Sequence, residues 1–184
     1  MSEFTKKSIT INDEFVPPPN TELLYLDNQL VLSKGYMMGI VAASGVGKSQ
    51  ICEYFASIWI KPELSQHIQF KTYDQSCLYI DTERSLNDCY NGLQRIKGRI
   101  NSSITPSTFH FESFESIYNT EEYLIHLEYL IQQHSDVALV ILDGMNDFIS
   151  DINNNSESSA LFKSLNTIAL DIRKSPFFSI IFML

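Results

Sequence analysis

The chain has 184 residues, of which 44% are hydrophobic and 19% are charged, so it can bury a core and is not a disordered chain. Its 22 acidic residues outnumber its 13 lysines and arginines, and the net charge of -9 argues against a surface built mainly to grip nucleic-acid phosphates. No apolar run approaches the ~20 residues that span a bilayer, and the polar N-terminus lacks a secretory signal. We therefore expect one cytoplasmic domain with no membrane partner.

Alternating strands and helices are predicted along most of the chain. Residues 1–20 are polar and end in three prolines, which is typical of a flexible arm, so we place the domain at 21–184. A small hairpin is expected around Asp27 and Asn28. The predicted core strands are 38–42, 77–80, 108–114, 137–142 and 177–184, and the predicted helices are 48–60, 86–100, 119–134 and 158–174. This alternation predicts a three-layer α/β fold, with helices on both faces of a mainly parallel sheet.

A phosphate-binding loop is predicted between the first core strand and the helix at 48–60. The segment 42–49 ends in Gly-Lys-Ser, where the glycines let backbone N–H groups turn towards a phosphate. Lys48 would supply a cation and Ser49 a hydroxyl for Mg²⁺. The alternative is a glycine-rich turn with a solvated lysine. The predicted nucleotide-binding residues, with ATP and Mg²⁺ as ligands, are Ala43, Ser44, Gly45, Val46, Gly47, Lys48, Ser49 and Gln50.

Carboxylates end two of the predicted strands. Asp143 follows a continuous apolar run, where α/β sheets place functional groups, and we predict that it orients Mg²⁺ through water. The alternative is a capping or turn aspartate. Glu83 is the candidate general base that positions a water, and its alternative is a solvated carboxylate before a helix. Asp81 is predicted only to cap or orient.

The remaining polar and aromatic residues are predicted to be structural. Cys52, Cys77 and Cys89 form no CxxC pair and are interpreted as reduced core residues, and the four histidines show no metal-ligand spacing. Trp59 follows the helix period and is expected in the core. A solvated cationic face is predicted for Arg84, Arg95, Lys97 and Arg99, and the alternative is that these residues contact a partner.

Three segments, in order, resemble the motifs of RecA-like ATPases. They are 42–49, 79–83 and 139–143, and the resemblance extends over about 23–184. The segment 143–158 is similar to one in RepA-like hexameric replicative helicases and in predicted ATPases of mobile elements. The resemblance implies ATP hydrolysis with Glu83 as catalytic base and Lys48 in the site. It also implies a homo-oligomeric ring serving DNA replication or mobilisation, with a neighbouring subunit completing hydrolysis.

The sequence departs from the RecA-like pattern after its fifth core strand. Family members continue with a sensor residue, DNA-binding loops and a finger residue that reaches a neighbour's nucleotide. We expect this chain to be a C-terminally incomplete core, in which the strand at 177–184 borders an exposed, aggregation-prone sheet edge. Single-stranded DNA would bind through the missing part. Two other functions stay open, namely a P-loop small-molecule kinase, although no arginine-bearing lid is seen, and a non-catalytic ATP-binding switch.

Overall fold

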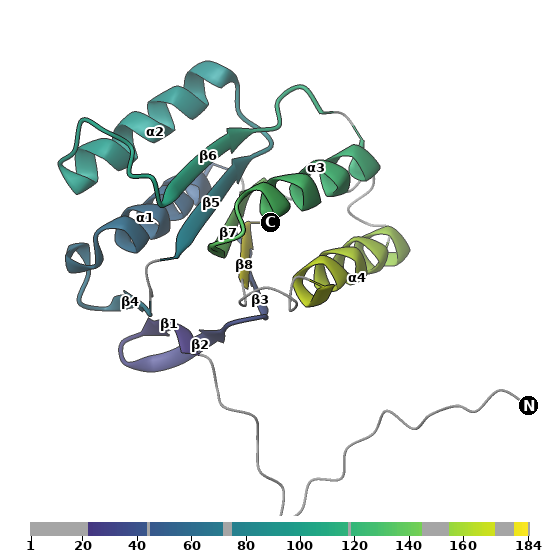
Figure 1. Ribbon diagram of the computed structural model, residues 1–184, viewed down its shortest axis with the longest axis horizontal. Coiled ribbons are helices and arrows are strands. Elements are labelled where there is room, and N and C mark those ends of the chain that lie inside the picture. Colours follow the sequence, from purple (N-terminus) through teal and green to yellow (C-terminus); the bar gives the residue numbers. More distant parts are fainter. Residues whose placement is uncertain are drawn as a thin grey trace, which may run out of the picture.

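The computed structural model describes six stretches of the chain, drawn as coloured ribbons in Figure 1. They are 22–43, 45–71, 75–117, 119–144, 155–171 and 179–183. The expected arm at 1–20 and residues 145–154, which form most of the segment 143–158 singled out above, lie outside the described residues. None of the helices in these stretches has the length and apolar composition that a transmembrane span requires.

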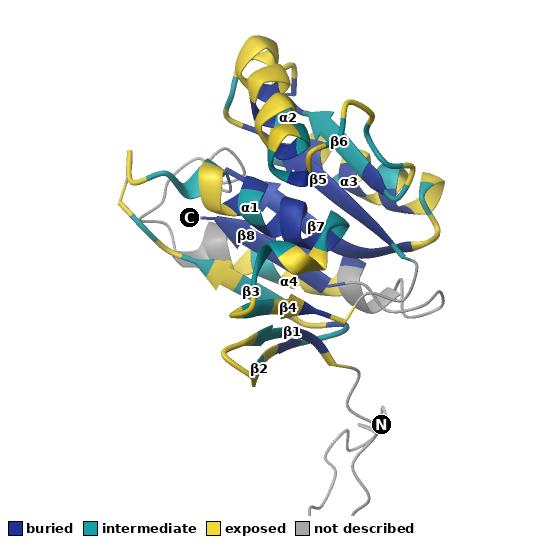
Figure 2. Ribbon diagram, turned by 90° about the vertical axis from the view of Figure 1, so that its left-hand side faces the viewer, coloured by how far each residue is buried: buried dark blue, intermediate teal, exposed yellow. Residues whose placement is uncertain are grey.

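Five strands in the described stretches form one all-parallel sheet. In spatial order they are β3 (Met37–Ile40), β8 (Ser179–Met183), β7 (Val137–Asp143), β5 (Ser76–Asp81) and β6 (Phe109–Ser113). Every residue of β5, β7 and β8 is buried, and these strands form the dark centre of Figure 2. Burial on both faces explains why they are nearly continuous apolar runs in the sequence.

Helices cover both faces of this sheet, which confirms the expected α/β fold. In Figure 1, α1 (Lys48–Ile60) and α2 (Leu86–Ile100) lie on one side of the sheet, and α3 (Thr120–Gln133) and α4 (Asn155–Asp171) lie on the other. Alternate residues of β5 enter two separate cores: Cys77 and Tyr79 pack with α1, whereas Leu78 and Ile80 pack with α3 and α4.

A small antiparallel sheet packs beside α1. The predicted hairpin is present, and Asp27 and Asn28 have the positive φ angles, 48° and 65°, of a type I′ turn. A third strand was not predicted, and its Phe70 ring lies 5.3 Å from the ring of Trp59, centroid to centroid. Trp59 is therefore a core residue, as expected. The strands, in spatial order, are β2 (Gln29–Ser33), β1 (Glu22–Leu26) and β4 (Ile68–Phe70).

The predicted position of the sheet edge is wrong. β8 does not border an exposed edge, because it pairs with β7 on one side and with β3 on the other. β3 is an edge strand of the described sheet, and its residues are half-buried or exposed. The order of strands along the chain does not fix their order in space. The right-handed crossover rule sets the hand of each connection but not which strand the next strand pairs with.

Candidate functional site

The loop between β3 and α1 has the backbone that the glycine spacing predicts. Gly45 and Gly47 have φ angles of 79° and 89°, a left-handed conformation that residues with a side chain rarely adopt. Gly47 is the N-cap of α1, and its carbonyl oxygen accepts hydrogen bonds from the N–H groups of Gln50 and Ile51. Ala43 and Val46 are exposed beside these glycines, and Ser44 lies outside the described residues.

The N-terminus of α1 differs from the N-termini of α2 and α3. Ser85 caps α2 and Asn119 caps α3 through side-chain oxygens, and both helices carry acids in their first turn. α1 has neither a side-chain cap nor an acid there, and its first residue is Lys48. Uncapped N–H groups, the positive end of the helix dipole and a lysine together favour an anion at this point.

Asp143 contacts the first turn of α1. Ser49 donates a hydrogen bond of 3.1 Å from its hydroxyl to Asp143 Oδ1, although the two residues are 94 positions apart. Asp143 Oδ2 accepts a 2.6 Å hydrogen bond from the hydroxyl of Tyr79, and the Asp143 residue is only 4% exposed. Burial raises the pKa of Asp143, and the hydrogen bond from Tyr79 opposes this shift. The carboxylate is thus held in one orientation beside the phosphate loop.

Glu83 lies in a turn that is tied to the end of β7. Asp81 pairs with Asp143 across the two strands, and Asp81 Oδ1 accepts hydrogen bonds from the N–H groups of Glu83 and Arg84. The Thr82 hydroxyl donates a hydrogen bond to the carbonyl oxygen of Gly144. Glu83 is exposed and lies close to Gly144. A Cβ atom added to Gly144 would be 2.7 Å from the carboxyl carbon of Glu83. The structure therefore brings the candidate base next to the strand end that carries Asp143.

A buried ion network beneath this site was not predicted. Glu53 of α1 is fully buried, and Arg95 holds both of its carboxylate oxygens, at 2.6 and 2.8 Å. Arg99 approaches the same carboxylate at 3.4 Å, and Arg84 Nη1 donates to it at 2.8 Å. The predicted solvated cationic face is therefore wrong for Arg84 and Arg99, which are partly buried, whereas Arg95 is exposed and also pairs with Glu53. Two sequence signals were available: an acid among the inward positions of α1, and two arginines four residues apart on α2.

The donor atoms at the site match what Mg²⁺ requires. Mg²⁺ is usually bound through one or two protein oxygens while water and substrate phosphates complete its shell. Ser49 and Asp143 supply such oxygens next to the uncapped helix. Within the described stretches, no three His, Cys, Asp or Glu side chains are grouped as metal ligands. A Mg²⁺ ion held by Ser49 and Asp143 would complete its coordination with phosphate and water.

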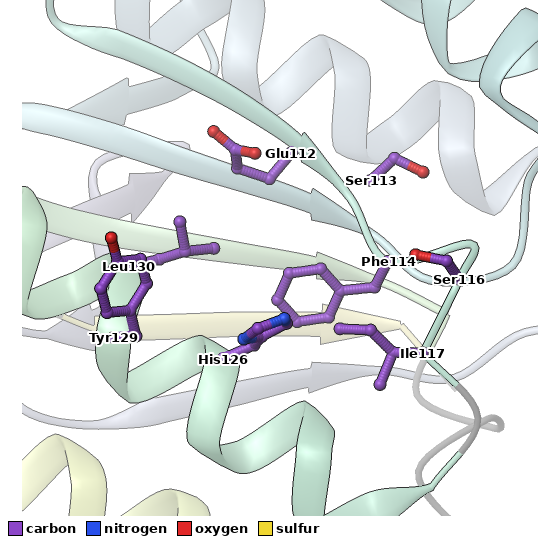
Figure 3. A pocket seen from close by; sticks show the side chains of 8 residues that line it. All are labelled: Glu112, Ser113, Phe114, Ser116, Ile117, His126, Tyr129 and Leu130. Carbon is purple, nitrogen blue, oxygen red and sulfur yellow. The ribbon is translucent and has the colours of Figure 1, made fainter.

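A hollow of about 210 Å³ lies between the end of β6 and α3. Figure 3 shows the ring of Phe114 at its centre, with His126, Ile117 and Tyr129 around it. None of the predicted site residues lines this hollow. It is therefore separate from the phosphate loop.

The arrangement of the main sheet and its helices is consistent with a Rossmann-like or P-loop-like α/β fold. Comparison of the chain with models of protein families and with curated proteins finds no match in either set.

Proposed function

We propose that this chain is the nucleotide-binding core of a RecA-like, helicase-type ATPase that binds and hydrolyses ATP with Mg²⁺. The observation that carries the proposal is the hydrogen bond between Ser49 and Asp143 beside the uncapped N-terminus of α1. This hydrogen bond brings together the two oxygen-bearing side chains predicted to hold the metal. They meet beside the helix N-terminus that favours a phosphate.

The loop and the start of α1 would hold the phosphates. Left-handed glycines, such as Gly45 and Gly47, allow the loop backbone to turn N–H groups towards an anion. Lys48 would add a positive charge near the β- and γ-phosphates, where it is a point charge that a neutral side chain cannot replace. Val46 would contribute through its backbone N–H, whereas the N–H of Gln50 already donates to the Gly47 carbonyl oxygen.

Ser49 and Asp143 would hold the metal ion. Bound there, Mg²⁺ would neutralise negative charge on the β- and γ-phosphates. Ser49 would contribute its hydroxyl oxygen directly, and Asp143 would accept hydrogen bonds from the water molecules of the ion. The hydrogen bond of Tyr79 to Asp143 Oδ2 supports this arrangement, because it leaves Oδ1 on the side of α1.

Glu83 would act as the general base. It would accept a proton from a water molecule while the water oxygen forms a bond to the γ-phosphorus. The bond from the γ-phosphorus to the bridging oxygen breaks at the same time, and ADP leaves with that electron pair. The closeness of Glu83 to Gly144, directly after Asp143, supports this role, because the base and the metal carboxylate then share one edge of the sheet.

The wider biological role follows from the resemblance alone. We propose a homo-oligomeric ring that acts on single-stranded DNA in replication or mobilisation, with a neighbouring subunit completing the hydrolytic site. Turnover by this chain alone is therefore expected to be slow. The net charge of -9 disfavours DNA binding over most of the surface of this chain.

Calorimetric titration with a non-hydrolysable ATP analogue, with and without Mg²⁺, tests the binding step. We expect saturable binding that Mg²⁺ strengthens and that Lys48→Ala abolishes. Lys163→Ala is the matched control, because Lys163 is an exposed lysine on α4 and should bind as the wild type does. A folded wild-type protein that binds no analogue would refute the proposal.

Turnover assays separate the catalytic roles. Glu83→Gln should keep analogue binding and lose phosphate release, whereas Glu128→Gln, an exposed position on α3, should keep both. Unchanged phosphate release by Glu83→Gln would show that Glu83 is not the base. Tight binding of ATP without turnover would instead support the non-catalytic ATP-binding switch. Detection of a phosphorylated small-molecule acceptor by mass spectrometry would instead support a P-loop small-molecule kinase.

A further inference from the structure

The guanidinium group of Arg84 joins the candidate metal carboxylate to the buried ion network. Its Nη2 lies 3.4 Å from Asp143 Oδ2 and donates a 3.2 Å hydrogen bond to the hydroxyl of Tyr79. That hydroxyl in turn donates to the same Asp143 oxygen. Arg84 therefore reaches Asp143 by two routes, one direct and one through Tyr79.

The other nitrogens of Arg84 are held in place. Its Nε binds Asp81 Oδ2, and its Nη1 binds Glu53 Oε1. The side chain is only 17% exposed, so water competes weakly for these contacts. A planar guanidinium fixed at two nitrogens has a defined position for its third.

Neutralising Glu53 does not by itself require Arg84. Arg95 already binds both carboxylate oxygens of Glu53, and Arg99 adds a third cation. Neither Arg95 nor Arg99 has a described contact with Asp143. The feature that distinguishes Arg84 from the other two arginines is its contact with the Asp143 side of the network.

We propose that Arg84 is a positioning residue that orients Asp143 for the metal ion, directly and through Tyr79. With Oδ2 held by Arg84 and Tyr79, Oδ1 stays towards Ser49 and the start of α1. This role rests on the proposed Mg²⁺-dependent nucleotide site. Groups that orient a metal ligand are worth about 10- to 100-fold in metal affinity.

Arg84 also connects the metal carboxylate to the turn that carries Glu83. One oxygen of Asp81 binds the Arg84 side chain, and the other accepts the N–H groups of Glu83 and Arg84. Reorienting Asp81 would therefore move the candidate base together with the metal carboxylate.

The test measures Mn²⁺ affinity of the protein–ADP complex by electron paramagnetic resonance, and ADP affinity in EDTA by calorimetry. One variant is Arg84→Lys, which keeps a cation beside Glu53 and Asp81. The other is Tyr79→Phe, which keeps the aromatic ring stacked on Phe111, with 4.5 Å between the ring centroids. Arg99→Lys is the matched control, because it changes a Glu53 partner that does not touch Asp143. Neither measurement depends on turnover.

We expect Arg84→Lys and Tyr79→Phe to weaken Mn²⁺ binding about tenfold, with ADP affinity in EDTA unchanged. Arg99→Lys should leave both affinities within about twofold of the wild type. Unchanged Mn²⁺ affinity in both variants would overturn the proposal, and so would an equal loss of ADP affinity in EDTA, which indicates a general structural role. If Arg84→Lys fails to fold, Tyr79→Phe decides. A wild type that binds no ADP under either condition would instead refute the proposed function.

Discussion

Replacing Glu53 by glutamine is expected to lower the free energy of unfolding by about 3 kcal/mol at pH 7. Glu53 is fully buried, and the change removes its charge while keeping its shape. Removing one partner of a buried ion pair costs about 3–5 kcal/mol, because the other charge is left unpaired. We expect the lower end of that range, since Arg84 keeps Asp81 as a partner and the Arg95 side chain is 43% exposed.

The effect of this substitution should depend on pH. Burial alone would raise the pKa of Glu53, but hydrogen bonds from Arg95 and Arg84 outweigh it and leave the pKa below its ordinary value. A carboxylate with a lowered pKa in the folded state stabilises the protein above its unfolded pKa, and this contribution is lost as the pH falls through the folded value. Glutamine does not titrate. The difference in stability between wild type and variant should therefore narrow in acid.

Urea unfolding followed by the fluorescence of Trp59, the single tryptophan, measures both effects. Trp59 is buried on α1, the helix that carries Glu53, so its emission reports on the relevant core. Glu128→Gln removes an exposed carboxylate and should change the stability by less than about 0.5 kcal/mol. A loss below about 1 kcal/mol for Glu53→Gln, or a difference that widens in acid, would refute this account of the network.

Three further outcomes are expected. Gly144→Ala should cost about 2 kcal/mol in thermal unfolding and reduce any turnover, because φ is +100° and the new Cβ would lie 2.6 Å from Thr82 Oγ1, beside Glu83. A Cβ at position 39 would lie 2.7 Å from the Phe182 ring, so Gly39→Ala should cost about 2 kcal/mol in urea unfolding unless the ring can shift. At pH 8 the buried thiols should react with a disulfide reagent at least about tenfold more slowly in the native protein than in urea, and equal rates would contradict their placement. Burial raises the pKa of one of them, Cys89, to about 11. The three thiols are those of Cys52, Cys77 and Cys89.

Local sequence patterns predicted the helices whose ends are set by residues next to them in the sequence. α1 and α2 occupy the predicted ranges, and Ser85 accepts the N–H of Asp88 as its position before the helix suggests. α4 begins at Asn155, earlier than the predicted start at 158, because helix ends are weakly encoded. β4 was missed because a three-residue strand has too few positions to show a period and is held by its pairing with β1.

The residues of the candidate site were predicted from motifs, but their partners were not. Ser49 ends the Gly-Lys-Ser segment and Asp143 ends a continuous apolar run, so the local sequence predicts each residue without their contact. Tyr79 and Arg84 touch Asp143 only because β5 and β7 pair with Asp81 opposite Asp143. Register between distant strands is a property of the whole sheet, and one sequence does not reveal it.

The place of β3 beside β8 has a consequence for how the protein folds. The N–H of Gly35, just before β3, donates to the hydroxyl of Ser179, just at the start of β8, across 144 residues of chain. Closing a loop of that length costs about 4 kcal/mol of chain entropy. The contacts between β3 and β8 must offset this cost before their pairing stabilises the fold. Within the described sheet β3 pairs only with β8, so during synthesis this pairing cannot form until β8 leaves the ribosome. We therefore expect the nucleotide site to be among the last parts of the protein to form, and the unpaired β3 to be the segment most exposed to misfolding before then.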